Sequence, residues 1–131
     1  MGSVSTIMYK GISILYNDMS EARPSDVIEL CMQSREAMKK CAPHSVYVLV
    51  NVKNIRFNSQ VIQVIKETTK INSPFVKTTA VYGLEGFTLT LAQMVAKFSG
   101  REIRPVASLE EGKEWLLEQA QTQETYNHSV I

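Results

Sequence analysis

The sequence predicts an α/β fold in which an N-terminal β-hairpin is followed by right-handed βα crossovers, with about five strands and four helices around a mixed sheet. Two observations support this fold class. Val46 to Val50 form an apolar run with almost no alternation, which is typical of a central strand covered on both faces. The elements follow in the order ββαβαβαβα, which favours parallel strands joined by right-handed crossovers.

The first part of the chain is predicted to form a hairpin and a helix. Residues 4–8 and 12–16 are rich in β-prone side chains, and Gly11 between them can take the positive φ that a tight turn needs. Pro24 suits the first turn of a helix, which is expected to end before Pro43. The inward face of this helix is predicted to consist of Val27, Leu30, Cys31, Ser34, Met38 and Cys41.

A second helix is expected directly after the central strand. Asn58 is the predicted N-cap, because its side chain can accept a hydrogen bond from the first turn. Phe57 would then pack against Ile62, four positions into the helix. The buried stripe is expected to include Val61, Ile62, Val64, Ile65, Thr68 and Thr69, and the helix should stop at residues 72–74.

The remaining elements are a strand, a third helix, a short strand and a last helix. Residues 75–82 form the predicted fourth strand, and Pro105 places residues 103–107 at a sheet edge. Residues 108–111 form a capping box for the last helix, and residues 120–131 are expected to fray. The third helix is predicted to face inward with Phe87, Leu91, Met94, Val95 and Phe98, and the last with Leu109, Trp115 and Leu116.

Length and composition narrow the function classes. The 131 residues fit a single domain, 1–131, with a core over 4–119. A net charge of +1, with both signs interspersed, offers no basic field for nucleic acid. The longest apolar run is far shorter than the ~20 residues of a membrane helix, so no membrane insertion is expected. Cys31 and Cys41 lie about 15 Å apart on one predicted helix, too far for a disulfide, which favours a reducing, cytoplasmic location.

Groups that could carry catalysis or bind a metal are scarce. The only histidines are His44, in a loop before the central strand, and His128, in the tail, so neither is placed to activate a nucleophile. Neither cysteine has a second metal ligand two to four residues away. We therefore expect no enzyme activity, no cofactor and no metal site.

One stretch resembles a known family. Asn51 to Ser59, NVKNIRFNS, is similar to the strand-loop-helix signature of STAS domains (sulphate transporters and anti-sigma-factor antagonists), in which an Asp-Ser pair opens the helix and the serine is the phosphoacceptor. Ser59 falls on that serine, whereas Asn58 replaces the acid and Gln60-Val61 replace a small Ser/Thr-Gly pair.

The resemblance continues over roughly residues 7 to 118 and is closer to the SpoIIAA-like branch, also described as STAS/CRAL-TRIO-like. It is carried by Ile14–Asp18, Phe75–Lys77 to Tyr82–Gly83, Ser99–Arg101 and Leu109–Leu116. It implies a SpoIIAA-like fold and a non-enzymatic regulatory module that binds a protein partner of unknown identity. The implied binding residues are Asn54, Phe57, Asn58, Ser59 and Gln60, with Ser59 as the candidate phosphoacceptor.

Two further expectations concern ligands and assembly. The CRAL-TRIO relatives imply an alternative function, a carrier or sensor of a small apolar ligand or lipid, for which the candidate lining residues are Phe87, Leu91, Met94 and Phe98. An ordinary core can use the same residues. Consecutive crossovers place helices on one face of a sheet, so part of the other face would need a cover, and we expect a homodimer.

Overall fold

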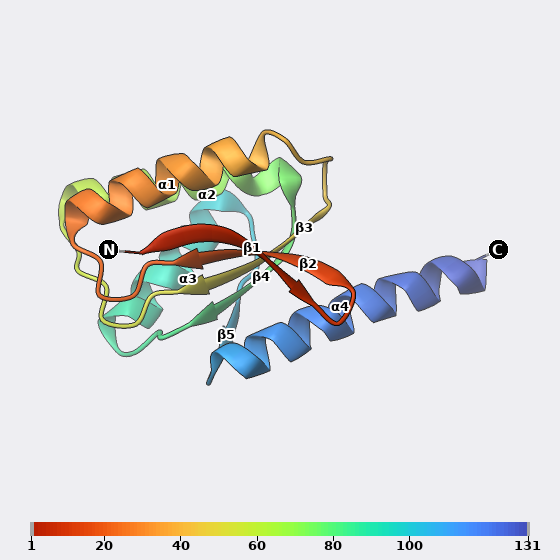
Figure 1. The fold of residues 1–131 in the computed structure, drawn as a ribbon. Coiled ribbons are helices and arrows are strands. Elements are labelled where there is room, and N and C mark those ends of the chain that lie inside the picture. Colours follow the sequence, from red (N-terminus) through yellow and green to blue (C-terminus); the bar gives the residue numbers. More distant parts are fainter. Residues whose placement is uncertain (1, 131) are drawn as a thin grey trace.

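A five-stranded mixed sheet forms the centre of the molecule (Figure 1). The structure is a computed structural model that describes the backbone of residues 2–130 and the side chains of residues 2–122. The strands lie in the order β1-β2-β3-β4-β5; β1 pairs with β2 in the antiparallel sense, and β2 to β5 are parallel to one another. The strands are β1 (Ser3–Tyr9), β2 (Ile12–Asp18), β3 (Val46–Asn51), β4 (Val76–Tyr82) and β5 (Arg104–Val106). The predicted hairpin, central strand and edge strand are therefore confirmed.

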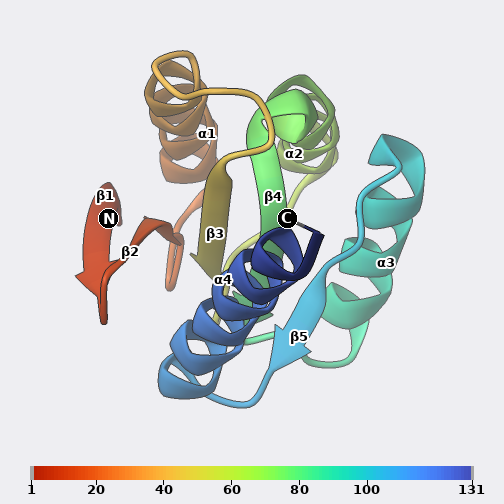
Figure 2. The same cartoon turned by 90° about the vertical axis from the view of Figure 1, so that its right-hand side faces the viewer.

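Three helices cover one face of the sheet and the fourth covers the other (Figure 2). The helices are α1 (Pro24–Met38), α2 (Ser59–Asn72), α3 (Phe87–Ser99) and α4 (Leu109–Val130), and a short 3₁₀ turn, η1 (Ser73–Phe75), leads into β4. Right-handed crossovers between neighbouring parallel strands place α1 to α3 side by side. The chain then leaves the edge strand β5 and returns under the sheet as α4.

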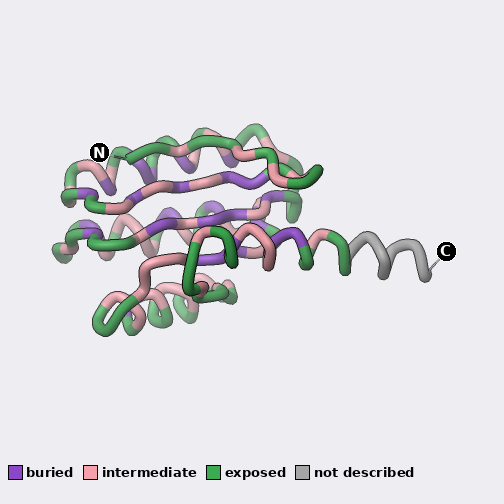
Figure 3. Tube along the Cα trace, turned by 60° about the horizontal axis from the view of Figure 1, so that its bottom comes forward, coloured by how far each residue is buried: buried purple, intermediate pink, exposed green. Residues whose placement is uncertain are grey.

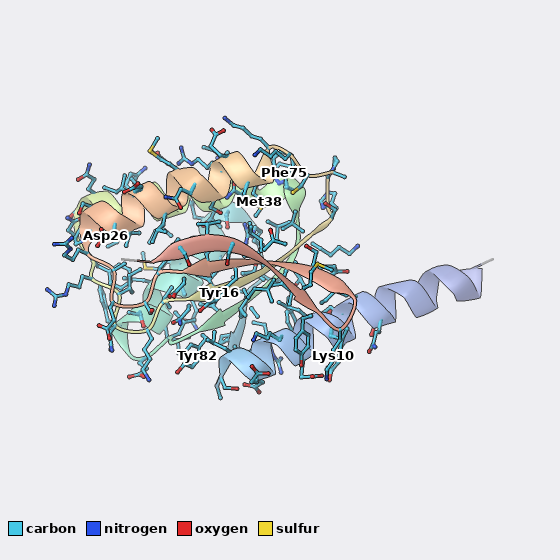
Figure 4. The ribbon with its side chains drawn as sticks, in the orientation of Figure 1. Lys10, Tyr16, Asp26, Met38, Phe75 and Tyr82 are labelled. Atoms are coloured by element: carbon cyan, nitrogen blue, oxygen red, sulfur yellow. The ribbon has the colours of Figure 1, made fainter. Side chains whose placement is uncertain are left out.

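Alternation along β3 divides the core into two layers. Val48 and Val50 face α1 and α2, whereas Leu49 faces α4. The same division is visible in Figure 4, where Met38 and Phe75 lie on the α1 side of the sheet and Tyr16 lies on the other. Leu49 and Leu116 are fully buried where α4 meets the sheet.

Helix α4 can approach the sheet closely because Gly112 has no side chain. A Cβ at Gly112 would lie 2.7 Å from Leu49 Cδ1 and 3.3 Å from Val106 Cγ2. The crossover argument predicted that part of this face would stay open, but α4 covers its centre. We expected a homodimer because part of this face needed a cover, and α4 supplies that cover at the centre of the face. The homodimer itself stays a prediction.

The last helix has a helical backbone from Leu109 to Val130, so it continues into residues 120–131, for which the sequence predicted fraying. The fraying itself stays a prediction. It was based on the missing apolar period, which indicates a lack of packing rather than a lack of helix. Residues 118–124, EQAQTQE, are mostly strong helix formers. Residue 131 and the side chains from 123 onward lie outside the described part of the chain.

Candidate functional site

Three loops meet at the carboxyl ends of the parallel strands. They are residues 19–23 between β2 and α1, residues 52–58 between β3 and α2, and residues 83–86 between β4 and α3, and we call them the strand-end rim. Backbone hydrogen bonds join them: the Met19 amide donates to the Asn51 carbonyl at 2.8 Å, and the Val52 amide donates to the Tyr82 carbonyl at 2.9 Å. Ligand sites of open parallel sheets commonly occupy this position.

The first two rim loops hold each other in an uncommon conformation. Glu21 and Asn54 both have positive φ, 59° and 57°, which few residues other than glycine adopt. The Asn54 side-chain amide donates to the Glu21 carboxylate at 2.8 Å, and the Glu21 amide donates to the Lys53 carbonyl at 2.9 Å. These bonds fix the loops before any partner arrives, which lowers the entropy lost on binding.

The start of α2 is built as the sequence predicted. Asn58 is the N-cap, and its side-chain oxygen accepts from the Val61 amide at 2.8 Å. Ser59 and Gln60 follow as exposed first-turn residues, and Phe57 is half-buried against the core beneath α1 and α2. The Ser59 hydroxyl therefore lies at the positive end of the helix dipole, open to solvent. Its modification stays a prediction.

The groups that could activate a serine lie elsewhere in the described structure. The His44 amide donates to the Pro74 carbonyl at 2.9 Å, which places His44 at the amino end of β3, opposite the rim. His128 lies beyond the residues whose side chains are described. Within those residues, no three His, Cys, Asp or Glu side chains gather as a metal site would require. Cys31 and Cys41 are free thiols, and burial raises the pKa of Cys31.

Helix α3 is turned differently from the prediction. Phe87, Met94 and Phe98 are 66%, 56% and 48% exposed, and of the predicted inward set only Leu91, at 8%, is buried. Figure 3 shows α3 coloured largely as exposed and intermediate. Apolar residues lie on more than one side of this helix, so their spacing along the sequence is compatible with two different inward faces. The stripe that faces the sheet and α2 contains Thr88, Leu91, Ala92, Val95 and Ala96.

The outward residues Phe87, Met94 and Phe98 form what we call the α3 stripe. Phe87 is the first residue of α3 and follows Gly86 of the rim, so the stripe begins at the rim. At its other end the Phe98 ring lies 4.7 Å from Lys66 Nζ and 5.3 Å from Lys70 Nζ, both on α2. Three large apolar side chains are therefore exposed along one helix, with cations at one end.

A partly enclosed apolar cavity of about 140 Å³ lies between α2 and α3. Of the four lining residues predicted for an apolar ligand, Leu91 lines this cavity, whereas Phe87, Met94 and Phe98 lie outside its lining. Their role in binding an apolar ligand stays a prediction. The sequence analysis missed Thr79 and Arg101, which also line the cavity. Strand alternation could have placed Thr79 on the helix side, but nothing in the sequence signals that Arg101 folds inward.

Comparisons with known proteins add two solved structures. An uncharacterized protein of the DUF3478 family with a SpoIIAA-like fold, from Shewanella loihica PV-4, is similar with a TM-score of 0.71, at 9% identity over 88% of this chain and 93% of that one. An anti-sigma-factor antagonist (STAS) domain protein from Planctomyces limnophilus is similar with a TM-score of 0.59, at 15% identity over 89% of this chain and 97% of that one.

Comparisons of the sequence with family models and curated proteins do not assign the chain to a family. No protein-family model matches the chain, and a search of curated proteins found no match. None of the helices in the described residues is both long and apolar enough to span a membrane. At these low identities the structural likeness establishes the fold, and the resemblance that the sequence suggested is confirmed at that level: the chain has the STAS/SpoIIAA-like fold.

Proposed function

We propose that the chain is a non-enzymatic regulatory module that binds a protein partner through the strand-end rim, the entrance of α2 and the α3 stripe. The single observation that carries the proposal is the exposure of Phe87, Met94 and Phe98 on one side of α3. Contiguous exposed apolar side chains are uncommon on monomers and mark interaction surfaces. Aromatic residues and methionine are also enriched at protein interfaces.

The fold supports a regulatory role. One of the two similar structures is described as an anti-sigma-factor antagonist (STAS) domain protein. Asn54 of the rim and Ser59 and Gln60 of α2 are exposed polar groups around the entrance of α2, and the α3 stripe begins directly after the rim residue Gly86. A polar rim beside an apolar patch is the usual composition of an interface. The free thiols support a reducing location such as the cytoplasm.

Two matched variants and wild type test the proposal. Partners are captured from an extract of the source cells with wild type, with the double variant Phe87→Ser/Met94→Ser, and with Met32→Ser. Met32 is an equally exposed methionine, at 60%, on the far helix α1. We expect a partner that wild type and Met32→Ser retain equally and that the double variant loses by about tenfold or more, as for an interface hot spot.

The variants can be compared directly because the substituted side chains, Phe87, Met94 and Met32, are exposed to a similar degree. Surface substitutions change stability by only about 0.5 kcal/mol, so each variant should unfold close to wild type in a thermal scan. A double variant that is folded and captures the same proteins as wild type, in the same amounts, would exclude the α3 stripe as the binding surface.

The alternative function, a carrier or sensor of a small apolar ligand or lipid, has weaker support. The cavity between α2 and α3, at about 140 Å³, is smaller than the roughly 300 Å³ of ordinary ligand pockets.

A homodimer through the α3 stripe is a particular case of the proposed interaction. Light scattering at high micromolar concentration would reveal it: wild type would have the mass of a dimer, and the double variant would have a lower mass.

A further inference from the structure

Arg101 is a largely buried cation beneath the end of α3. Its Nη1 donates to the Thr69 carbonyl on α2 at 3.3 Å, and its Nη2 donates to the Thr79 hydroxyl on β4 at 2.5 Å. Its Nε is fully buried and has no partner among the described protein atoms. The guanidinium is thus held between a helix and the sheet by one bond from each terminal nitrogen, and its Nε–H is unused.

This charge has no acidic counterpart in the described residues. Burial lowers the pKa of Arg101 to about 10, and no nearby carboxylate opposes that shift. The group is still protonated at neutral pH, so the fold keeps a positive charge in a poorly solvated place. Buried charges are ordinarily paired, because the loss of hydration is otherwise unfavourable by several kcal/mol.

The apolar cavity reaches this guanidinium. Arg101 and Thr79 are part of its lining, and its floor is Val50 and Val81 of the sheet. Its walls are apolar side chains of the two helices, namely Ile62, Ile65, Leu91 and Val95. A dry cavity of roughly 150 Å³ lined by such residues holds one benzene molecule. The volume here, about 140 Å³, is therefore that of a single small ring or a short branched chain.

A second space adjoins the first at the same arginine. It measures about 120 Å³ and shares Ile65, Thr69 and Arg101 with the apolar cavity. Asn17 lines it, is only 5% exposed, and has a side-chain oxygen with no partner among the described atoms. Arg101, with its unpaired Nε, therefore borders both spaces, whereas the unpaired Asn17 oxygen belongs to a residue that lines the second space only.

We propose that this cavity binds a small apolar carboxylate, about the size of benzoate, whose carboxylate accepts hydrogen bonds from Arg101 and whose hydrocarbon part lies between α2 and α3. The arrangement supplies what such a ligand needs: a guanidinium that matches a carboxylate in geometry and charge, and an apolar space of the right volume beside it. The size excludes long-chain fatty acids. The ligand site lies on the inner side of α3, and Phe57 at the entrance of α2 also lines it, so it adjoins the proposed protein-binding surface.

Benzoate and benzyl alcohol are the probes that test it, because they share a ring and differ in charge. Each is titrated into the full chain while methyl and amide NMR signals are followed. We expect benzoate to bind about tenfold or more tightly than benzyl alcohol, since a charge-assisted hydrogen bond is stronger than a neutral one. The largest shifts should fall on Leu91, Val95 and Ile65, which line the cavity.

Variants separate the charge from the cavity. Arg101→Met removes the charge, keeps an apolar stem, and should lower benzoate affinity about tenfold while changing benzyl alcohol affinity less than about threefold. Arg104→Met removes an exposed arginine that lies over Trp115 on the other face and should change neither affinity. Ala92→Leu fills the cavity and should weaken both probes.

Three outcomes would overturn the proposal: equal affinity of wild type for the two probes, benzoate shifts centred away from the cavity, or benzoate binding that survives Arg101→Met. In each case Arg101 would serve only to cap the last turn of α2 through the Thr69 carbonyl. If Arg101→Met does not fold, the wild-type ratio of the two probes and the location of the shifts still decide the question.

Discussion

Helices α1 and α3 flank α2 on the same face of the sheet, yet they are packed to different degrees. Helix α1 buries five side chains, whereas α3 buries Leu91 alone and leaves the α3 stripe exposed. Helix α1 lies over the long strands β1 to β3, but α3 lies beside β5, which has only three residues. The side of the molecule near α1 is therefore the more fully packed, and the side near α3 carries the surface that we propose for recognition.

The largest expected difference between the two sides comes from one leucine on each helix. Leu30 of α1 packs in the core cluster with Val27 and borders a mostly polar pocket at its outer side, while Leu91 of α3 borders the apolar cavity. Leu30→Ala should lower the free energy of unfolding by about 3 kcal/mol, because it removes side-chain atoms that pack in the core cluster beneath α1. Leu91→Ala should lower the free energy of unfolding by less, about 1 to 2 kcal/mol, because in the wild-type structure fewer atoms pack against the Leu91 side chain.

Urea unfolding of both variants measures this difference. The two positions carry the same residue on helices of the same layer and are both buried, so helix propensity and transfer free energy cancel in the comparison. Equal losses for the two variants would mean that α3 is packed as firmly as α1, and the division of the molecule into a stable side and a recognition side would be wrong.

The same division explains which parts of the structure could be predicted from the sequence. The hairpin, the central strand and the Asn58 cap follow from local patterns, and each was found where expected. The orientation of α3 did not follow, because a helix that is apolar on two sides has no unique inward face. Arg101 was missed for a different reason: its burial depends on α2 and β4, which are distant in sequence.

Intermediate effects are expected at the entrance of α2, between the two flanking helices. Asn58→Ala removes the side-chain bond to the Val61 amide and should lower the free energy of unfolding by about 1 kcal/mol.

Ser59→Asp should leave the thermal midpoint within a few degrees of wild type, because a negative charge at an exposed first turn is favourable by only about 0.3 to 1 kcal/mol.

Partner binding completes this test of Ser59. Adding negative charge to the surface should weaken capture of the partner, as a phosphate would, whereas Ser59→Ala should preserve both stability and capture. Asn58→Ala controls for loss of the cap without added charge. A large drop in the thermal midpoint of Ser59→Asp would show that this side chain is needed for packing, and a role as a phosphorylation switch would then be abandoned.

The smallest effect is expected from a polar contact on the well-packed side, where the hairpin turn meets α4. The Glu114 carboxylate accepts hydrogen bonds from the Lys10 ammonium, at 2.6 Å, and from the Tyr9 hydroxyl. Figure 4 shows Lys10 beside α4. These bonds, the one from Lys10 first, hold the pKa of Glu114 below its usual range. Because the Lys10 and Glu114 side chains are 61% and 46% exposed, solvent screens most of the attraction.

Glu114→Gln should therefore lower the thermal midpoint by a few degrees at most at neutral pH. The folded state favours the ionised carboxylate, so wild type holds its small advantage above the ordinary glutamate pKa and loses it as the pH falls through the lowered one. Thermal scans from pH 7 to pH 3 should show the two midpoints converge, while Glu110→Gln, at a carboxylate paired with Lys113 on the same helix, controls for loss of a surface charge. A midpoint difference that stays constant over this range would show that Glu114 acts through packing, and charge would then have no measurable part in holding the hairpin to α4.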